Sequence, residues 1–183
     1  MMEFEWIDLT QHEMQAAFEM QKNLPAEMNG NYSNNDVGKR TAGYVGQVAA
    51  WKWLDNAINV DSYNYDLFVD GVRVEVKTST RNVNPDANHW ARIAASNDTQ
   101  LCDYYLFCQA QWQLNAKDKK LRHGAYILGM LSVEEMRERM HWAEKGSMEP
   151  GDDFPERGDC WKIRHNRLIP AWMASKMIKL QSA

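Results

Sequence analysis

The chain has 183 residues, of which 44% are hydrophobic and 25% charged, a composition that suits one domain with a packed core. No apolar run approaches the roughly 18 residues of a membrane span, so no membrane partner is expected. The acidic start of the chain does not have the pattern of a secretory signal. A formal net charge of −4 counts against a general nucleic-acid binder, because such proteins usually carry a basic surface.

The first third of the chain predicts two helices. One covers Asp8 or Thr10 to about Asn23 and ends before Pro25, where proline cannot continue the helix. A polar loop over residues 27–36 leads to a second helix from Val37 to about Asn56, in which apolar residues recur at helical spacing.

The remainder predicts strands followed by helices. The expected strands are a hairpin of Tyr63–Val69 and Val72–Ser79, then Asp103–Trp112 and Gly124–Leu131. Residues 82–100 are expected to be irregular, residues 115–122 to form a basic turn, and residues 146–159 to be mobile. Ser132 and Glu135 form a capping box for a helix to about Glu144, and a short helix is expected over Ala171–Leu180. We therefore expect an α/β fold, with a mixed sheet of about four to five strands flanked by helices.

The hairpin raises a question of charge. If Asp70 and Gly71 are the central turn residues, as this dipeptide favours, Leu67 faces Val74 and Asp66 faces Glu75. Like charges directly opposite each other destabilise an antiparallel pair. One side of the hairpin is apolar, and the other side carries Asn64, Asp66, Phe68, Arg73, Glu75, Lys77 and Ser79.

Two interpretations account for the facing acids. The first is an ordinary solvent-exposed face on which Lys77 softens the repulsion between Asp66 and Glu75. The second is a divalent-cation site, because Mg²⁺ is held by one or two carboxylates and keeps several waters. A bound cation turns the repulsion into attraction, and a neighbouring lysine can stabilise charge that develops on a phosphate. We favour the second interpretation.

Asp66, eight residues, then Glu75-Val76-Lys77 resembles the signature of the PD-(D/E)XK nucleases, which have the restriction-endonuclease-like fold. The small size and acidic character are typical of a small phage- or prokaryote-type member. The resemblance implies that Asp66, Glu75 and the Val76 carbonyl bind Mg²⁺, with Mn²⁺ able to substitute, and that Lys77 assists the attacking water. Many members carry a supporting Glu on the preceding helix, where this chain has Gln47. Gln47 would then be a variant of the site, a cause of weaker metal binding, or a sign that a different acid takes the role.

Basic residues near this motif are candidate nucleic-acid contacts. They are Lys39, Arg40, Arg81 and Arg92. Each could touch phosphate, and the alternative for each is an ordinary surface residue. No GxxxxGK[ST] motif occurs, so no nucleotide cofactor is expected. The three cysteines form no CxxC pair, which favours free thiols in a cytoplasm, here that of a bacterial or phage-infected cell.

These observations predict a single domain over residues 1–183 that hydrolyses phosphodiester bonds in DNA. Its nuclease core would cover about 37–131, with an N-terminal helix at about 8–23 and a C-terminal helix and tail at 132–183. Cutting two strands requires two sites, which a homodimer would supply. One alternative is a Holliday junction resolvase or other structure-selective resolvase. An alternative from another class is a non-catalytic DNA- or protein-binding accessory protein with a degenerate nuclease core.

Overall fold

The structure, a computed structural model, describes residues 4–22, 37–81, 83–97, 99–111, 123–150, 152 and 155–181. Within these ranges the larger sheet contains β1 (Glu5–Asp8), β2 (Ile58–Asn59), β3 (Leu67–Val69), β4 (Val72–Thr80), β6 (Tyr104–Gln111) and β7 (Gly124–Ser132). The smaller sheet contains β5 (Trp90–Ala94), β8 (His141–Ala143) and β9 (Cys160–Arg164). The α-helices are α1 (Gln11–Lys22), α2 (Val37–Trp53), α3 (Val133–Arg139) and α4 (Ala171–Gln181). Single 3₁₀ turns occur at Ala95–Asn97 and His165–Arg167.

The larger sheet is mixed in direction. Its strand order is β1-β7-β6-β4-β3-β2. β4 and β6 pair in parallel, and the other pairs in this sheet are antiparallel. β6 is buried along its whole length, which agrees with its nearly continuous apolar sequence. The expected α/β class is therefore confirmed, and the described part of the chain has a six-stranded sheet rather than one of four to five strands.

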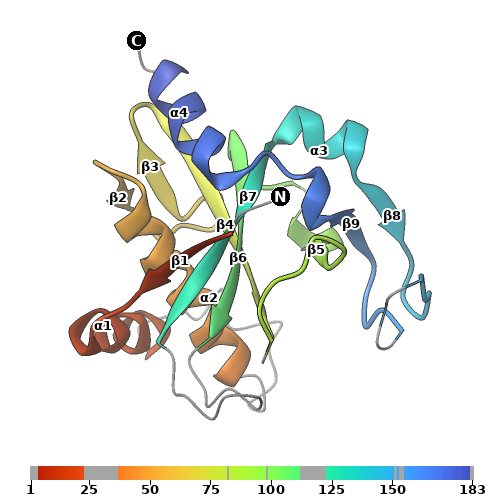
Figure 1. Ribbon diagram of the computed structural model, residues 1–183, viewed down its shortest axis with the longest axis horizontal. Helices are drawn as coiled ribbons and strands as arrows, with labels where there is room; N and C mark the ends of the chain where they lie inside the picture. The colour runs from red at the N-terminus through yellow and green to blue at the C-terminus, as the bar shows by residue number, and fades with distance from the viewer. Residues whose placement is uncertain are drawn as a thin grey trace.

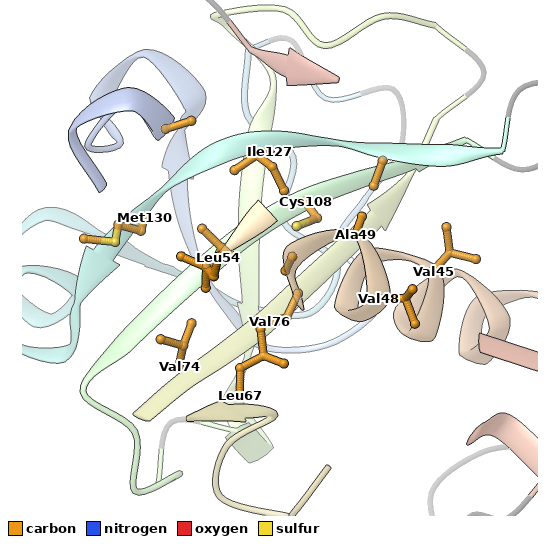
Figure 2. Packing of buried hydrophobic residues seen from close by; sticks show 14 of the residues in the cluster. Val45, Val48, Ala49, Leu54, Leu67, Val74, Val76, Cys108, Ile127 and Met130 are labelled. Atoms are coloured by element: carbon orange, nitrogen blue, oxygen red, sulfur yellow. The ribbon is translucent and has the colours of Figure 1, made fainter. Parts of the chain in front are cut away.

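Helices α1, α2 and α4 lie on one face of this sheet and share one hydrophobic core with it (Figure 1). Figure 2 shows Val48 and Ala49 of α2 in the same cluster as Val76 of β4 and Ile127 of β7. Burying a valine or isoleucine side chain in this cluster contributes about 1.5–3 kcal/mol. This packing fixes the position of α2 over β4.

Gly46 allows α2 to approach β4 closely. A Cβ atom at Gly46 would lie 2.0 Å from Thr78 Oγ1 and 2.9 Å from Thr78 Cβ. At Gly43, one turn earlier, a Cβ would meet nothing within 4 Å. The contact at Gly46 thus holds the next residue, Gln47, close to the hairpin strands.

The smaller sheet and α3 cover the opposite face. Ile93 of β5 and Ile163 of β9 pack with Tyr105 and Phe107 of β6 and with Leu128 of β7. Figure 1 shows β5, β8 and β9 on the side of the molecule away from α1. Because both faces are covered, Glu75 of β4 is buried and Lys77 is largely buried, whereas Arg73 and Thr80 nearer the strand ends are more exposed.

Several expectations are confirmed and others are wrong. The hairpin register is as predicted from Leu67 opposite Val74 to Val69 opposite Val72, but the first strand begins at Leu67 rather than Tyr63, so Asp66 and Glu75 are not a ladder pair. The Ser132–Glu135 capping box is present. The helix that it starts was expected to reach about Glu144, but it ends at Arg139. The following residues pair with β9, so a contact distant in sequence overrides the local pattern.

The regions expected to be irregular or mobile contain further structure. Residues 82–100 include β5, and the tail includes β9. Between residues 146 and 159, the N–H of Gly146 donates to the Glu156 carbonyl at 2.8 Å, and the N–H of Glu156 donates to Ser147 at 2.9 Å. The expected basic turn at 115–122 lies outside the described residues. No helix in the described ranges is long and apolar enough to cross a membrane.

Candidate metal centre

Asp66 directly precedes β3, at the point where β4 continues beyond the end of β3. The regular ladder ends at Leu67 opposite Val74, one pair short of Asp66 and Glu75. The N–H of Asp66 donates to the Val74 carbonyl at 3.1 Å, and Asp66 Oδ2 accepts from the N–H of Val76 at 2.7 Å. The Asp66 carboxylate therefore takes the place of a strand partner beside Val76. Because the N–H and C=O of a strand residue face the same edge, the Val76 carbonyl faces this side as well.

Glu75 is buried, with 5% of its surface exposed, so this side of the hairpin is not an ordinary solvent-exposed face. Its Oε1 atom accepts hydrogen bonds from Lys77 Nζ at 2.7 Å and from Gln100 Nε2 at 2.8 Å. Its Oε2 atom is buried and has no hydrogen-bond partner among the described residues. A buried carboxylate oxygen without a partner is costly, which is the condition that a bound cation would relieve.

The pKa of Asp66 also indicates that a bound cation would be favourable here. Burial raises the pKa of Asp66 well above its usual value, and the nearby charge of Glu75 raises it further. The Val76 N–H and the charge of Lys77 act in the opposite direction without reversing the shift. The charge of Glu75 therefore acts on Asp66, although the two residues are not paired in the regular ladder.

Lys77 is held in place by two acceptors. Its Nζ atom donates to Glu75 Oε1 and to Gln100 Oε1, both at 2.7 Å. Gln100 Nε2 in turn donates to Glu75 Oε1 and to the Tyr63 carbonyl, both at 2.8 Å. The side chain of Gln100 thus joins the lysine, the glutamate and the loop before Asp66.

Sequence reasoning missed Gln100. The residue lies at the end of a segment expected to be irregular, and no motif marks it. It reaches the site because β6, which follows shortly after it, pairs in parallel with β4, so that Tyr105 lies opposite Glu75. That long-range pairing has no signature in the local sequence.

Gln47 is connected to the acids through a residue that sequence reasoning also missed. It is buried, and its Nε2 atom donates to Asn59 Oδ1 at 2.8 Å and more weakly to Asp61 Oδ1 at 3.5 Å. Burial raises the pKa of Asp61, and the charge of Asp61 also raises the pKa of Asp66. Asp61 therefore supplies a third carboxylate near the pair, on the side from which Gln47 approaches. That a different acid takes the role of the family's helix glutamate stays a prediction, and Asp61 is the candidate for that acid.

The four basic residues suggested as nucleic-acid contacts have different surroundings. The side chain of Lys39 lies outside the described part of the chain, and Arg40 is partly buried on α2. Arg81 directly follows β4. Burial lowers the pKa of His165, and the charges of His89 and Arg81 lower it further. Arg92 forms ion pairs in the smaller sheet, at 2.9 Å to Glu156 and 3.0 Å to Asp152.

The donor atoms suit a small divalent cation. Asp66, Glu75 and the Val76 carbonyl supply oxygen ligands, and Mg²⁺ completes its shell with water when a protein offers one or two carboxylates. The orphaned Glu75 Oε2 atom and the raised pKa of Asp66 agree with such a ligand. Within the described residues, no group of three or more His, Cys, Asp or Glu side chains is arranged to hold a metal ion. The candidate centre therefore depends on two carboxylates and a carbonyl, with Asp61 outside them.

Comparisons of this chain with protein-family models, curated proteins and solved structures found no match. Its kinship with the PD-(D/E)XK nucleases therefore remains a prediction that depends on the hairpin residues and their surroundings.

Proposed function

We propose that the protein is a Mg²⁺-dependent nuclease of the PD-(D/E)XK type that hydrolyses phosphodiester bonds in DNA. The single observation that carries the proposal is the buried, unpartnered Glu75 Oε2 atom beside Asp66, with Lys77 bound to the other oxygen of the same carboxylate. An ordinary structural ion pair gives no reason to bury a second carboxylate next to it, because burying like charges together is unfavourable.

Each residue has a distinct role in this proposal. Asp66, Glu75 and the Val76 carbonyl hold the cation, which when bound lowers the pKa of a water ligand and neutralises phosphate charge. Lys77 carries three N–H donors, of which two are engaged by Glu75 and Gln100. The third orients the attacking water or stabilises charge developing on the phosphate. Gln47 donates weakly to Asp61, at 3.5 Å, beside the proposed metal ligands.

The proposal is tested by incubating the protein with supercoiled plasmid, linear DNA and a four-way junction in Mg²⁺ or Mn²⁺. We expect metal-dependent cutting that Lys77→Ala abolishes and Lys52→Ala leaves intact, since Lys52 pairs with Glu13 on the helical side of the sheet. A strong preference for the junction would indicate the structure-selective resolvase.

A second measurement separates metal binding from catalysis. A ligand that binds only the folded state raises the melting temperature, so Mg²⁺ is expected to stabilise the wild type and not Asp66→Ala. If the wild type shows no cutting and no stabilisation by Mg²⁺, the nuclease proposal is overturned and the non-catalytic binding protein is favoured.

A further inference from the structure

Two exposed apolar residues, Tyr63 and Leu101, are connected to the candidate metal centre through Gln100. Tyr63 is 57% exposed and Leu101 is 62% exposed. Single exposed apolar residues are common on proteins and need no explanation. These two differ because Gln100, which holds Lys77 and Glu75, binds the backbone of Tyr63 directly and precedes Leu101 in the chain. Both residues are therefore connected to the candidate site through Gln100.

The position of Tyr63 is fixed by a tight loop. The N–H of Ser62 donates to the Tyr65 carbonyl at 3.1 Å, and Ser62 Oγ donates to the same carbonyl at 2.8 Å. The N–H of Asp61 donates to the Asp66 carbonyl at 3.1 Å, which ties the loop to the metal ligand itself. Since one Gln100 nitrogen binds both the Tyr63 carbonyl and Glu75 Oε1, the loop and the carboxylate lie side by side.

The charge of the protein bears on how it would hold DNA. Binding to duplex DNA depends largely on lysine and arginine contacts to phosphates, whereas this chain has a net charge of −4. Among the basic residues suggested as contacts, Arg92 already pairs with Glu156 and Asp152. Stacking of bases on aromatic side chains is the other main source of affinity for nucleic acid, and it acts on bases that are unpaired.

We infer that Tyr63 is a stacking platform for an unpaired base next to the scissile phosphate, and that Leu101 extends this apolar surface. The favoured substrate is then DNA that is single-stranded at the point of cleavage, such as a flap, a frayed end or an open junction. A base inside a duplex is covered by its neighbours and cannot stack on Tyr63 unless it leaves the helix. This inference depends on the proposed nuclease function and specifies its substrate class.

The test measures binding of a short single strand containing 2-aminopurine, and of the matching duplex, in Ca²⁺. We expect the wild type to prefer the single strand and to quench the fluorescent base. Tyr63→Ala should weaken single-strand binding about tenfold or more and remove the quenching, while leaving duplex binding unchanged. Tyr63→Phe retains the ring and should stay within about twofold of the wild type. Trp172→Ala, at a 58% exposed aromatic on α4, is the matched control and should have no effect.

Equal binding of the two DNA forms by the wild type, or equal losses for both in Tyr63→Ala, would overturn the inference. Cleavage in Mg²⁺, measured in parallel, keeps the two proposals apart. If cutting requires Lys77 but does not change in Tyr63→Ala or between single-stranded and duplex DNA, the nuclease proposal stands. The same result overturns the stacking role of Tyr63. Failure of the wild type to cut either substrate overturns the nuclease and, with it, the assignment of Tyr63 to a scissile phosphate.

Discussion

Lys77 Nζ lies 2.7 Å from Glu75 Oε1 and 2.7 Å from Gln100 Oε1. The ammonium group is therefore fixed by one charged and one neutral acceptor, and the same glutamine donates to the glutamate. This arrangement aligns Lys77 with the carboxylate that we assign to the metal. An amide can do this because it offers both a donor and an acceptor.

Gln100→Ala should lower the rate of DNA cleavage about 10–100-fold, the usual cost of losing a residue that orients metal ligands. Steady-state cleavage of a labelled strand in Mg²⁺ provides the measurement. Gln15→Ala, at a glutamine on α1 that bonds Glu19, is the control and should retain full activity. An unchanged rate in Gln100→Ala would show that Lys77 does not need this acceptor.

Asp66→Asn should stabilise the metal-free protein by about 1 kcal/mol. Burial and the charge of Glu75 raise the pKa of Asp66, so the ionised carboxylate is unfavourable in the fold. The asparagine oxygen can still accept from the Val76 N–H. Urea unfolding at pH 7 in EDTA measures this gain, and repetition in Mg²⁺ should show that the metal-induced stabilisation is lost. A large destabilisation in EDTA would contradict the electrostatic account.

Gln47→Glu should destabilise the metal-free protein by about 1–3 kcal/mol. The glutamine Nε2 atom donates to Asn59 and more weakly to Asp61, and a carboxylate would lose the donor while adding a charge beside Asp61. Urea unfolding in EDTA is the measurement, with Gln47→Met as a variant that removes the donor without adding charge. If Gln47→Glu proved as stable as the wild type, the charge of Asp61 would not act at position 47. Asp61 would then not be the acid that replaces the helix glutamate of the PD-(D/E)XK nucleases.

Two glycines on α2 should respond oppositely to the same substitution. Gly46→Ala places a Cβ 2.0 Å from Thr78 Oγ1, and such overpacking costs about 1–3 kcal/mol. Gly43→Ala meets nothing within 4 Å, so the better helix propensity of alanine should add up to about 1 kcal/mol. Equilibrium unfolding of both variants tests the approach of α2 to β4. A loss of stability in both, or in neither, would contradict the packing described here.

The ion cluster of the smaller sheet should make stability depend on pH. Lys162 Nζ lies 2.7 Å from Asp152 Oδ2 and 2.7 Å from Glu156 Oε1. Burial acts to raise the pKa of both acids, but their bonds to Lys162 and the charge of Arg92 outweigh it, so both pKa values are lowered. Burial acts to lower the pKa of Lys162, and the two acids reverse this, so its pKa is raised.

The sign of the effect follows from these directions. The acids contribute stability above their unfolded pKa values of about 4, and this is lost as pH falls through the lower folded values. Lys162 contributes stability below its unfolded pKa of about 10.4, which is lost as pH rises through the higher folded value. The free energy of unfolding should therefore be highest between these limits and fall in acid.

Lys162→Met leaves two buried carboxylates without their lysine and should cost about 3–5 kcal/mol at pH 7. Part of that cost should disappear at pH 4, because protonation of Asp152 and Glu156 relieves their repulsion. Urea titrations at both pH values provide the measurement. Lys22→Met, at an exposed pair with Glu19, should change stability by less than about 1 kcal/mol. An equal cost for Lys162→Met at both pH values would contradict the pairing of Lys162 with ionised Asp152 and Glu156.

The sequence predicted the hairpin well because its determinants are local. The Asp70-Gly71 turn, the alternation of valines and the Ser132–Glu135 capping box act over a few residues, and each appears in the structure. The regular ladder ends at Leu67 opposite Val74, one pair short of Asp66 and Glu75, but burial and then the charge of Glu75 raise the pKa of Asp66.

The missed features depend on contacts between distant segments. Within the described ranges, β5, β8 and β9 are short strands that pair with one another in a separate sheet. Asp61 and Gln100 enter the site through loop backbone and through the parallel pairing of β4 and β6. Neither a periodicity nor a motif marks such residues, because the tertiary fold alone brings them to the site.

The most direct test of the central claim is the initial rate at which a labelled DNA substrate is cut, in Mg²⁺ and in EDTA. The wild type, Lys77→Ala, Asp66→Asn and the control Lys52→Ala are compared at equal concentration and with folding verified for each. We predict cutting by the wild type and Lys52→Ala only in Mg²⁺, and none by the two site variants. Cutting that persists in Lys77→Ala and Asp66→Asn, or an inactive wild type, would contradict the assignment of the Asp66–Glu75–Lys77 group as a nuclease centre.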